Sequence, residues 1–269
     1  MPPPPPSSGT QPLDIGRALA HGLAAKGARL ALSDVDEAGL AETVAGLGGA
    51  EVRSDALDVT DRAAVLAYAD DVVAQFGTVN QVYNNAGIAF AGDVLTSTFE
   101  EIERVVDVDF WGVVNGTKAF LPHLIASGDG HVVNISSLFG LLAVPSQSAY
   151  NAAKFAVRGF TESLRQEMLV ARHPVRVTCV HPGGVRTGIA RNASRGEGYR
   201  DGAAMERFER TMLRMPPGDA ATTILTGVRR NRPRVLVGND ARLLDLLVRL
   251  VASGYQRPLA MGAARTLRP

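Results

Sequence analysis

The chain has 269 residues, of which 46% are hydrophobic and 20% charged, and its formal net charge is +1. A chain of this length can bury the core of one large α/β domain, and its charge gives no long-range attraction to nucleic acid or to an anionic membrane. An integral membrane span needs about 18 or more consecutive apolar residues, and the sequence contains no such run. The one cysteine, Cys179, lies in V-R-V-T-C-V and reads as a buried strand residue, which fits a reducing, cytoplasmic compartment.

The start of the chain, residues 1–14, differs from the rest by its proline and serine content. Because proline cannot donate to a sheet ladder, Pro2 to Pro6 predict an extended, disordered tail and not a strand. The segment also lacks the basic and apolar regions of a secretory signal.

From Ile15 onward, segments with helical periodicity alternate with short apolar runs. Glycines follow several of the helical segments, where they would end them. The expected helices are residues 15–27, 36–47, 61–76, 98–125, 148–170, 217–230 and 241–251, and the expected strands are 28–32, 52–57, 79–83, 131–135, 175–180 and 235–237. This alternation predicts an α/β fold in three layers, a doubly wound parallel sheet with helices on both faces.

We expect a single domain over residues 15–240, followed by a C-terminal helix and tail over 241–269. Residues 188–215 are polar and irregular, so they are a candidate loop over a substrate.

Five residues stand at or just past the carboxyl ends of predicted strands. In such sheets the ligand lies outside the carboxyl ends of the strands. The residues that would share this edge are Asp34, Asp58, Asn85, Ser137 and Pro182.

Tyr150 and Lys154 are four residues apart in an alanine-rich helix that follows the strand ending near Ser137. Both side chains would project from one helical face. An ammonium beside a phenol stabilises the phenolate, which makes the tyrosine a better acid/base near neutral pH. Alone, this spacing is more often an ordinary solvated face. The neighbouring strand ends favour a catalytic interpretation.

Four motifs together resemble those of the short-chain dehydrogenase/reductases. They are N-N-A-G at 84–87, N-I-S-S at 134–137, Y-N-A-A-K at 150–154 and P-G-G-V-R-T at 182–187. The resemblance implies a Rossmann-type fold that transfers a hydride between NAD(H) and an alcohol or ketone, and a homo-oligomer. It also implies roles for three residues: Tyr150 as general acid/base, Lys154 as the group that lowers its pKa and holds the nicotinamide ribose, and Ser137 as the group that fixes the substrate oxygen.

The same resemblance implies a set of cofactor-binding residues. Asp34 would bind the adenosine ribose and favour NAD over NADP, because a carboxylate repels a 2′-phosphate. Helix capping is the alternative for Asp34 and Asp58, and an ordinary turn or loop is the alternative for the others. Besides Tyr150 and Lys154, the set comprises Gly16, Asp34, Asp58, Val59, Asn85, Ala86, Gly87, Pro182, Gly183, Val185 and Thr187.

The first departure from the family pattern is Asp109, which stands where the family has an active-site asparagine. A carboxylate accepts hydrogen bonds but donates none. Our hypothesis is that Asp109 weakens the proton relay or raises the pKa of Tyr150. The alternative is a tolerated helix residue.

The second departure is the start of the domain, where the family has a strand and a glycine-rich turn that binds the pyrophosphate. Aligned on Gly16, the chain has Gly9, Thr10 and Asp14 where that turn has Thr, Gly and Gly. A missing first strand should expose two strand edges. Two interpretations stay open: an aberrant start ahead of an intact enzyme, which we favour, or a relative with the fold that binds dinucleotide poorly.

Other features point to no further partner. The five histidines have no metal-ligand spacing, so no metal site is expected. The basic run at 229–234 reads as a solvated helix end. The apolar helix at 241–251 could cover the substrate, join subunits or rest on a membrane, and packing on its own domain is the favoured interpretation.

Overall fold

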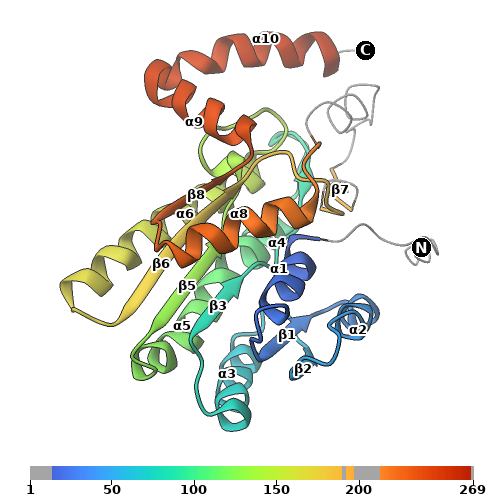
Figure 1. The fold of residues 1–269 in the computed structure, drawn as a ribbon. Helices are drawn as coiled ribbons and strands as arrows, with labels where there is room; N and C mark the ends of the chain where they lie inside the picture. The colour runs from blue at the N-terminus through green and yellow to red at the C-terminus, as the bar shows by residue number, and fades with distance from the viewer. Residues whose placement is uncertain (1–13, 190–191, 197–212, 268–269) are drawn as a thin grey trace.

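The computed structural model describes residues 14–189, 192–196 and 213–267 (Figure 1). The expected tail lies almost wholly outside the described residues, and so does most of the expected substrate loop. The helices are α1 (Ile15–Ala24), α2 (Glu37–Ala45), α3 (Arg62–Phe76), α4 (Phe99–Val106), α5 (Gly112–Ala126), α6 (Ser148–Val170), α8 (Pro217–Arg229), α9 (Asn239–Val251) and α10 (Gln256–Leu267). The strands are β1 (Leu30–Asp34), β2 (Val52–Ala56), β3 (Gln81–Asn84), β4 (Phe90–Ala91), β5 (Gly130–Ile135), β6 (Val175–Pro182), β7 (Ser194–Arg195) and β8 (Arg234–Val237).

The fold is the expected Rossmann-type α/β domain, with parallel strands joined by helices. The strands β3, β5, β6 and β8 form one parallel sheet in the order β3-β5-β6-β8, and β1 pairs with β2 in a second parallel sheet. Within the described residues, no strand lies between β1 and β3 to join the two sheets. The expectation of two exposed strand edges is therefore confirmed for this part of the chain.

Burial along the strands follows from this division. All six residues of β5 are buried, because β3 and β6 flank it and helices cover both of its faces. In β1, by contrast, Ser33 and Asp34 are exposed, and only Leu30 is buried. The central sheet around β5 and β6 therefore carries the core, and β1 with β2 forms a less buried wing.

Two apolar clusters cover the two faces of the larger sheet, which gives the three layers seen in Figure 1. One joins α1 and α8 to the sheet through residues such as Leu19, Val180 and Ile224. The other joins α3, α5 and α6 through residues such as Phe120 and Leu164. Side chains of this size stabilise a fold by about 1.5–3 kcal/mol each when fully buried. No helix in the described part of the chain is both long and apolar enough to cross a bilayer.

Three expectations need correction. The predicted helix at 98–125 is two helices, α4 and α5, joined by a π-helical turn at Asp107–Trp111, a distortion that periodicity does not reveal. Part of the expected irregular loop is the strand β7, which pairs with β4. The sequence did not predict this strand because a strand of two residues has no recognisable pattern. The expected C-terminal tail contains α10, whose alanines favour a helix.

Candidate active site

Tyr150 and Lys154 lie side by side in the first two turns of α6, close to the carboxyl end of β5. Both are buried, with 8% and 2% of their surface exposed. Nζ of Lys154 lies 5.5 Å from the centroid of the Tyr150 ring. The predicted pairing of these side chains is therefore present in the structure, inside the protein and not on a solvated face.

Asp109 contacts the same lysine from the π-helical turn between α4 and α5. Its Oδ2 lies 3.1 Å from Nζ of Lys154, and its Oδ1 accepts a 2.7 Å hydrogen bond from the Ile88 amide. Oδ2 has no well-directed hydrogen bond, so its contact with the ammonium is one of charge with charge. Both side chains are almost fully buried, which makes this an ion pair in the centre of the site.

Gly87, from the N-N-A-G motif, packs against this ion pair. A Cβ at this position would lie 3.2 Å from Nζ of Lys154 and 3.3 Å from Oδ1 of Asp109. The close approach of backbone to a buried charge pair is the physical reason for a glycine here.

Burial and charge act in opposite directions on the three titratable groups. Burial raises the pKa of Tyr150, the Lys154 ammonium lowers it and the Asp109 carboxylate raises it, with a net rise. Burial lowers the pKa of Lys154, but Asp109 and Tyr150 outweigh this effect and raise it overall. Burial also raises the pKa of Asp109, against the ammonium and the Ile88 amide. The ammonium at Oδ2 and the amide N–H at Oδ1 both favour the ionised carboxylate.

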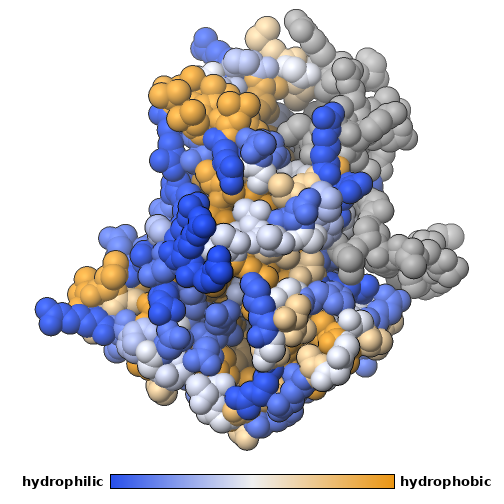
Figure 2. All heavy atoms as spheres, in the orientation of Figure 1, coloured by the Kyte–Doolittle hydropathy of each residue, from blue (hydrophilic) through white to orange (hydrophobic). Residues whose placement is uncertain are grey.

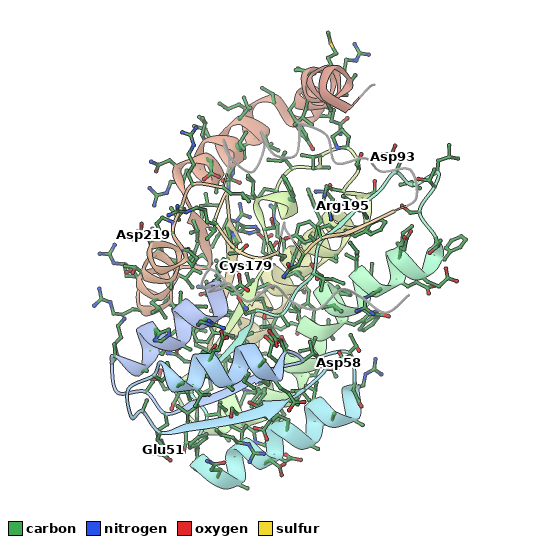
Figure 3. The ribbon with its side chains drawn as sticks, turned by 90° about the vertical axis from the view of Figure 1, so that its right-hand side faces the viewer. Glu51, Asp58, Asp93, Cys179, Arg195 and Asp219 are labelled. Carbon is green, nitrogen blue, oxygen red and sulfur yellow. The ribbon has the colours of Figure 1, made fainter. Side chains whose placement is uncertain are left out.

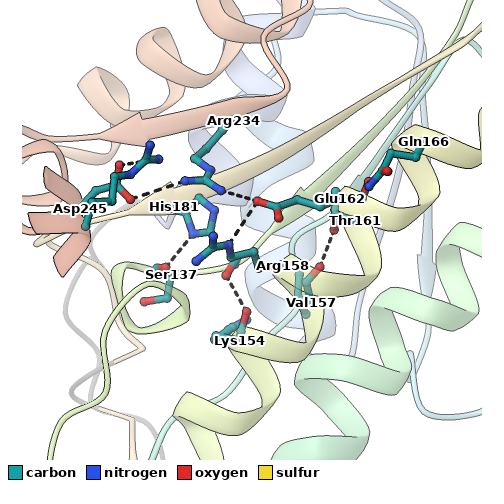
Figure 4. Close-up of polar contacts among 12 residues, drawn as sticks. Ser137, Lys154, Val157, Arg158, Thr161, Glu162, Gln166, His181, Arg234 and Asp245 are labelled. Atoms are coloured by element: carbon teal, nitrogen blue, oxygen red, sulfur yellow. Dashed lines mark hydrogen bonds and ion pairs between the residues drawn. The ribbon is translucent and has the colours of Figure 1, made fainter. Parts of the chain in front are cut away.

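Ser137 is the second residue after β5, and its side-chain hydrogen bond to Tyr150 lowers the pKa of the phenol. Its Oγ accepts a 3.1 Å hydrogen bond from the Phe139 amide, which leaves the hydroxyl proton free to point elsewhere. The ring of Phe139 meets that of Tyr150 edge to face, with centroids 6.3 Å apart. Nδ1 of His181 lies 2.9 Å from the Ser137 carbonyl oxygen, which fixes the backbone of Ser137 against β6 (Figure 4).

The two aspartates expected at the adenosine end both follow strands. Asp34 ends β1, and its Oδ1 accepts a 3.0 Å hydrogen bond from the Asp36 amide. Oδ1 of Asp58, labelled in Figure 3, accepts hydrogen bonds from the amide and the hydroxyl of Thr60, at 2.9 and 2.8 Å. The helix caps are Asp36 and Asp61 instead. The capping alternative is therefore wrong for Asp34 and Asp58.

Val59 and the N-N-A-G segment link the wing to the central sheet. The carbonyl of Val59 accepts a 2.9 Å hydrogen bond from Nδ2 of Asn115 on α5. A Cβ on Gly16 would lie 2.7 Å from Nδ2 of Asn85, so α1 passes directly beside this segment. Between Asn85 and Gly87, Ala86 continues the same turn after β3.

The segment from Pro182 to Thr187 leaves the end of β6 and folds back on itself. The Thr187 amide donates a 2.9 Å hydrogen bond to the Val185 carbonyl. Oδ2 of Asp240, at the start of α9, accepts a 2.6 Å hydrogen bond from the Gly184 amide. A Cβ on Gly183 would lie 2.4 Å from that same carboxylate.

Asp14 stands at the N-terminus of α1, the place where a helix in such a fold can bind a phosphate. Its Oδ1 accepts a 2.8 Å hydrogen bond from the Gly188 amide. The residues described at the two ends of the site fit a dinucleotide: carboxylates for a ribose at one, and an ammonium and a phenol at the other. The middle does not fit, because it presents a carboxylate to a pyrophosphate.

Sequence reasoning overlooked a set of positioning residues behind the site. Nδ2 of Asn84 donates to Oδ1 of Asn134 at 2.8 Å, and Nδ2 of Asn134 donates to Oγ1 of Thr161 at 3.0 Å, which ties β3, β5 and α6 together. Oγ of Ser136 donates to the carbonyl of Lys154 at 2.8 Å. Asn84, Asn134 and Ser136 lie within the quoted motifs, so the motifs held this signal. Asp240 had none.

Comparisons with known proteins point to one family. The family model described as short chain dehydrogenase matches residues 14–198. "Putative oxidoreductase SadH" of Mycobacterium tuberculosis is 64% identical over 253 residues, which cover 93% of this chain and 92% of that protein. "Dehydrogenase/reductase SDR family member 7B" of Xenopus tropicalis is 32% identical, over 88% of this chain and 78% of that one.

Among solved structures, the crystal structure of a short chain dehydrogenase/reductase from Burkholderia phymatum in complex with NAD matches with a TM-score of 0.81 and 32% identity. The match covers 90% of this chain and 91% of that one. The chain belongs to the short-chain dehydrogenase/reductase family.

Proposed function

We propose that the protein transfers a hydride between NAD(H) and a small alcohol or ketone, with Tyr150 as the general acid/base. The observation that carries the proposal is the cluster at the carboxyl end of β5, where the buried Tyr150 and Lys154 meet the half-buried Ser137. The name of the mycobacterial relative and the NAD in the solved relative support the same reaction class.

The side chains of this cluster act on the substrate oxygen. In the reducing direction the Tyr150 hydroxyl gives its proton to the carbonyl oxygen as that oxygen becomes an alkoxide, and in the oxidising direction the phenolate takes the alcohol proton back. The Ser137 hydroxyl donates a hydrogen bond to the same oxygen. The Lys154 ammonium stabilises the phenolate, and the Asp109 carboxylate offsets part of this stabilisation. NADH, when bound, supplies the hydride to the carbon.

We propose NAD in preference to NADP. Asp34 ends β1 with an exposed carboxylate, which suits ribose hydroxyls and repels a 2′-phosphate. The other candidate cofactor residues would hold the adenine side through Asp58 and Val59, and the nicotinamide side through the segment from Pro182 to Thr187. A homo-oligomer and a cytoplasmic location stay predictions.

A second candidate function is a binding protein that keeps the fold but transfers hydride poorly. Two observations favour it: the Asp14 carboxylate at the N-terminus of α1, and the absence of a strand joining β1 to β3 in the part of the chain that the structure describes. Asp109 adds to them, because a proton relay built on an asparagine loses a donor there.

Substrate-dependent oxidation of NADH tests the proposal. The full chain is mixed with NADH and a panel of aliphatic, alicyclic and aromatic ketones, and the loss of NADH absorbance is followed. We expect turnover with at least one class and a loss of about 100-fold or more in Tyr150→Phe. Tyr68→Phe is the matched control, because Tyr68 packs edge to face on Phe120 in a different cluster. Equal rates in the wild type and Tyr150→Phe would refute the assignment.

A further inference from the structure

Helix α9 has two apolar faces, of which the described residues of the chain cover only one. Its inner face packs on the segment after β5 through Ala241, Leu244 and Val248, as the favoured interpretation of the sequence expected. Its outer face carries a second apolar stripe that recurs at the spacing of one helical side. The stripe consists of Leu243, Leu246, Leu247, Leu250 and Val251, which are 41–76% exposed.

Figure 2 shows this stripe as part of a continuous hydrophobic surface at the upper left, over α9. Single exposed apolar residues are normal on a protein surface, but four leucines and a valine on one helical side are not. The exposed fractions of Leu243 and Leu250, 67% and 76%, mean that burying this side would remove most of the leucine surface from water. The outer side of α9 is therefore a candidate docking surface.

The charged residues around the stripe indicate whether a second copy of the chain or a lipid surface would cover it. Arg242 and Arg249 are two turns apart and flank the stripe on one edge, and the Arg249 side chain is 58% exposed. Arg257 opens α10 with an exposed side chain, and Arg265 and Arg268 follow in the sequence. Among the described residues, this surface therefore combines leucines with Arg242, Arg249 and Arg257, of which Arg249 also pairs with Asp245.

The acidic residues of this region are already used on the inner side. Residues 239–269 contain two of them, Asp240 and Asp245. Asp240 accepts from the Gly184 amide, and Asp245 pairs with Arg234 and Arg249 (Figure 4). A second copy of the chain packed on this stripe would bring arginines towards arginines with no spare carboxylate between them. An anionic lipid surface offers both phosphates for the arginines and an apolar boundary for the leucines.

We propose that the outer stripe of α9, with its flanking arginines, docks on the surface of a bilayer that contains anionic lipids. The helix lies in the plane of the interface and does not span the membrane. The domain stays on one side, attached through the inner face of α9. This docking surface does not depend on the hydride-transfer proposal.

Vesicle co-sedimentation of the full chain tests the docking surface. The vesicles are phosphatidylcholine alone or mixed with phosphatidylglycerol, at low and at high salt. We expect the protein to sediment with the anionic vesicles and to partition about tenfold less into either phosphatidylcholine alone or anionic vesicles at high salt. The double variant Leu246→Ser/Leu250→Ser should lower partitioning by about tenfold or more, and Arg242→Glu by several-fold.

The matched control is Leu169→Ser/Val170→Ser, which removes two apolar side chains of 65% and 85% exposure from the end of α6. It should partition like the wild type. Because all the substituted side chains are exposed, circular dichroism should show both double variants folded. Three results would overturn the proposal: no sedimentation of the wild type with anionic vesicles, an equal loss in the control, or light scattering that shows a dimer dissociated by Leu246→Ser/Leu250→Ser.

Discussion

Replacing Asp109 by asparagine removes a negative charge from the centre of the site while preserving the shape of the side chain. Its Oδ2 lies 3.1 Å from Nζ of Lys154, which is itself 5.5 Å from the Tyr150 ring centroid, so the carboxylate lies within about 9 Å of that ring. A unit charge at about 9 Å is worth about 2 kcal/mol at an effective dielectric constant of about 20. This energy changes the ionised fraction of a phenol about thirtyfold.

The sign follows from the position of the charge. The Asp109 carboxylate disfavours the phenolate and raises the pKa of Tyr150, after the larger effect of burial. In Asp109→Asn the phenolate should therefore form at lower pH, and alcohol oxidation should persist at lower pH than in the wild type. Reduction, which uses the protonated phenol, should gain nothing near neutral pH.

The assay needs no known substrate, because tyrosinate absorbance reports the phenolate directly. The titration of Tyr150 is the difference between each protein and the same protein carrying Tyr150→Phe. Asp107→Asn is the control, since Asp107 is an exposed carboxylate on the same π-helical turn. A Tyr150 titration that is unchanged in Asp109→Asn, or shifted equally in Asp107→Asn, would refute the reasoning.

Three further predictions concern the buried groups. Gly87→Ala should displace the ion pair of Lys154 and Asp109 and lower turnover about tenfold or more. The control is Gly159→Ala, because a Cβ at Gly159 has no atom within 4 Å. This control should leave turnover unchanged and raise the free energy of unfolding by about 0.5–1 kcal/mol. Burial raises the pKa of the Cys179 thiol to about 12, so it should react with a thiol reagent only after unfolding, and rapid labelling of the native protein would contradict this. Burial lowers the pKa of His131 and His181 to about 4, below the ordinary value of 6.5. Below pH 6.5 the unfolded chain binds more protons than the native one, so the stabilisation from the two neutral histidines is fully present only above that pH. The free energy of unfolding should fall by up to about 3 kcal/mol per histidine as the pH drops to about 4. A free energy of unfolding that does not change with pH in chemical denaturation would contradict this prediction.

The sequence predicted the larger sheet and its helices because each strand is a compact apolar run followed by a polar residue. Ser137, Tyr150 and Lys154 were predictable for the same reason: the end of β5 and the first turns of α6 place them together whatever the details of packing. The ion pair of Lys154 with Asp109 was only partly foreseeable. The sequence placed Asp109 near the site, but the π-helical turn that aims its carboxylate at the ammonium arises from packing between α4, α5 and α6.

Contacts between distant segments could not be read from local patterns. Asp240 lies 56 residues after the Gly184 amide that it accepts from, and Asp14 lies 174 residues before the Gly188 amide. The outer stripe of α9 was visible as apolar periodicity, but the sequence does not say which side the domain covers. The structure separates the inner side, around Val248, from the outer side, around Leu250.

Isothermal titration of the folded full chain with NADH tests the central claim most directly, because it needs no substrate. We predict saturable binding of NADH that is weakened by Asp34→Ala, weaker binding of NADPH, and tighter NADH binding in Asp14→Asn, which removes a carboxylate from the N-terminus of α1. No saturable heat with either dinucleotide, in a sample that circular dichroism shows to be folded, would contradict the account of this protein as an NAD(H)-dependent oxidoreductase.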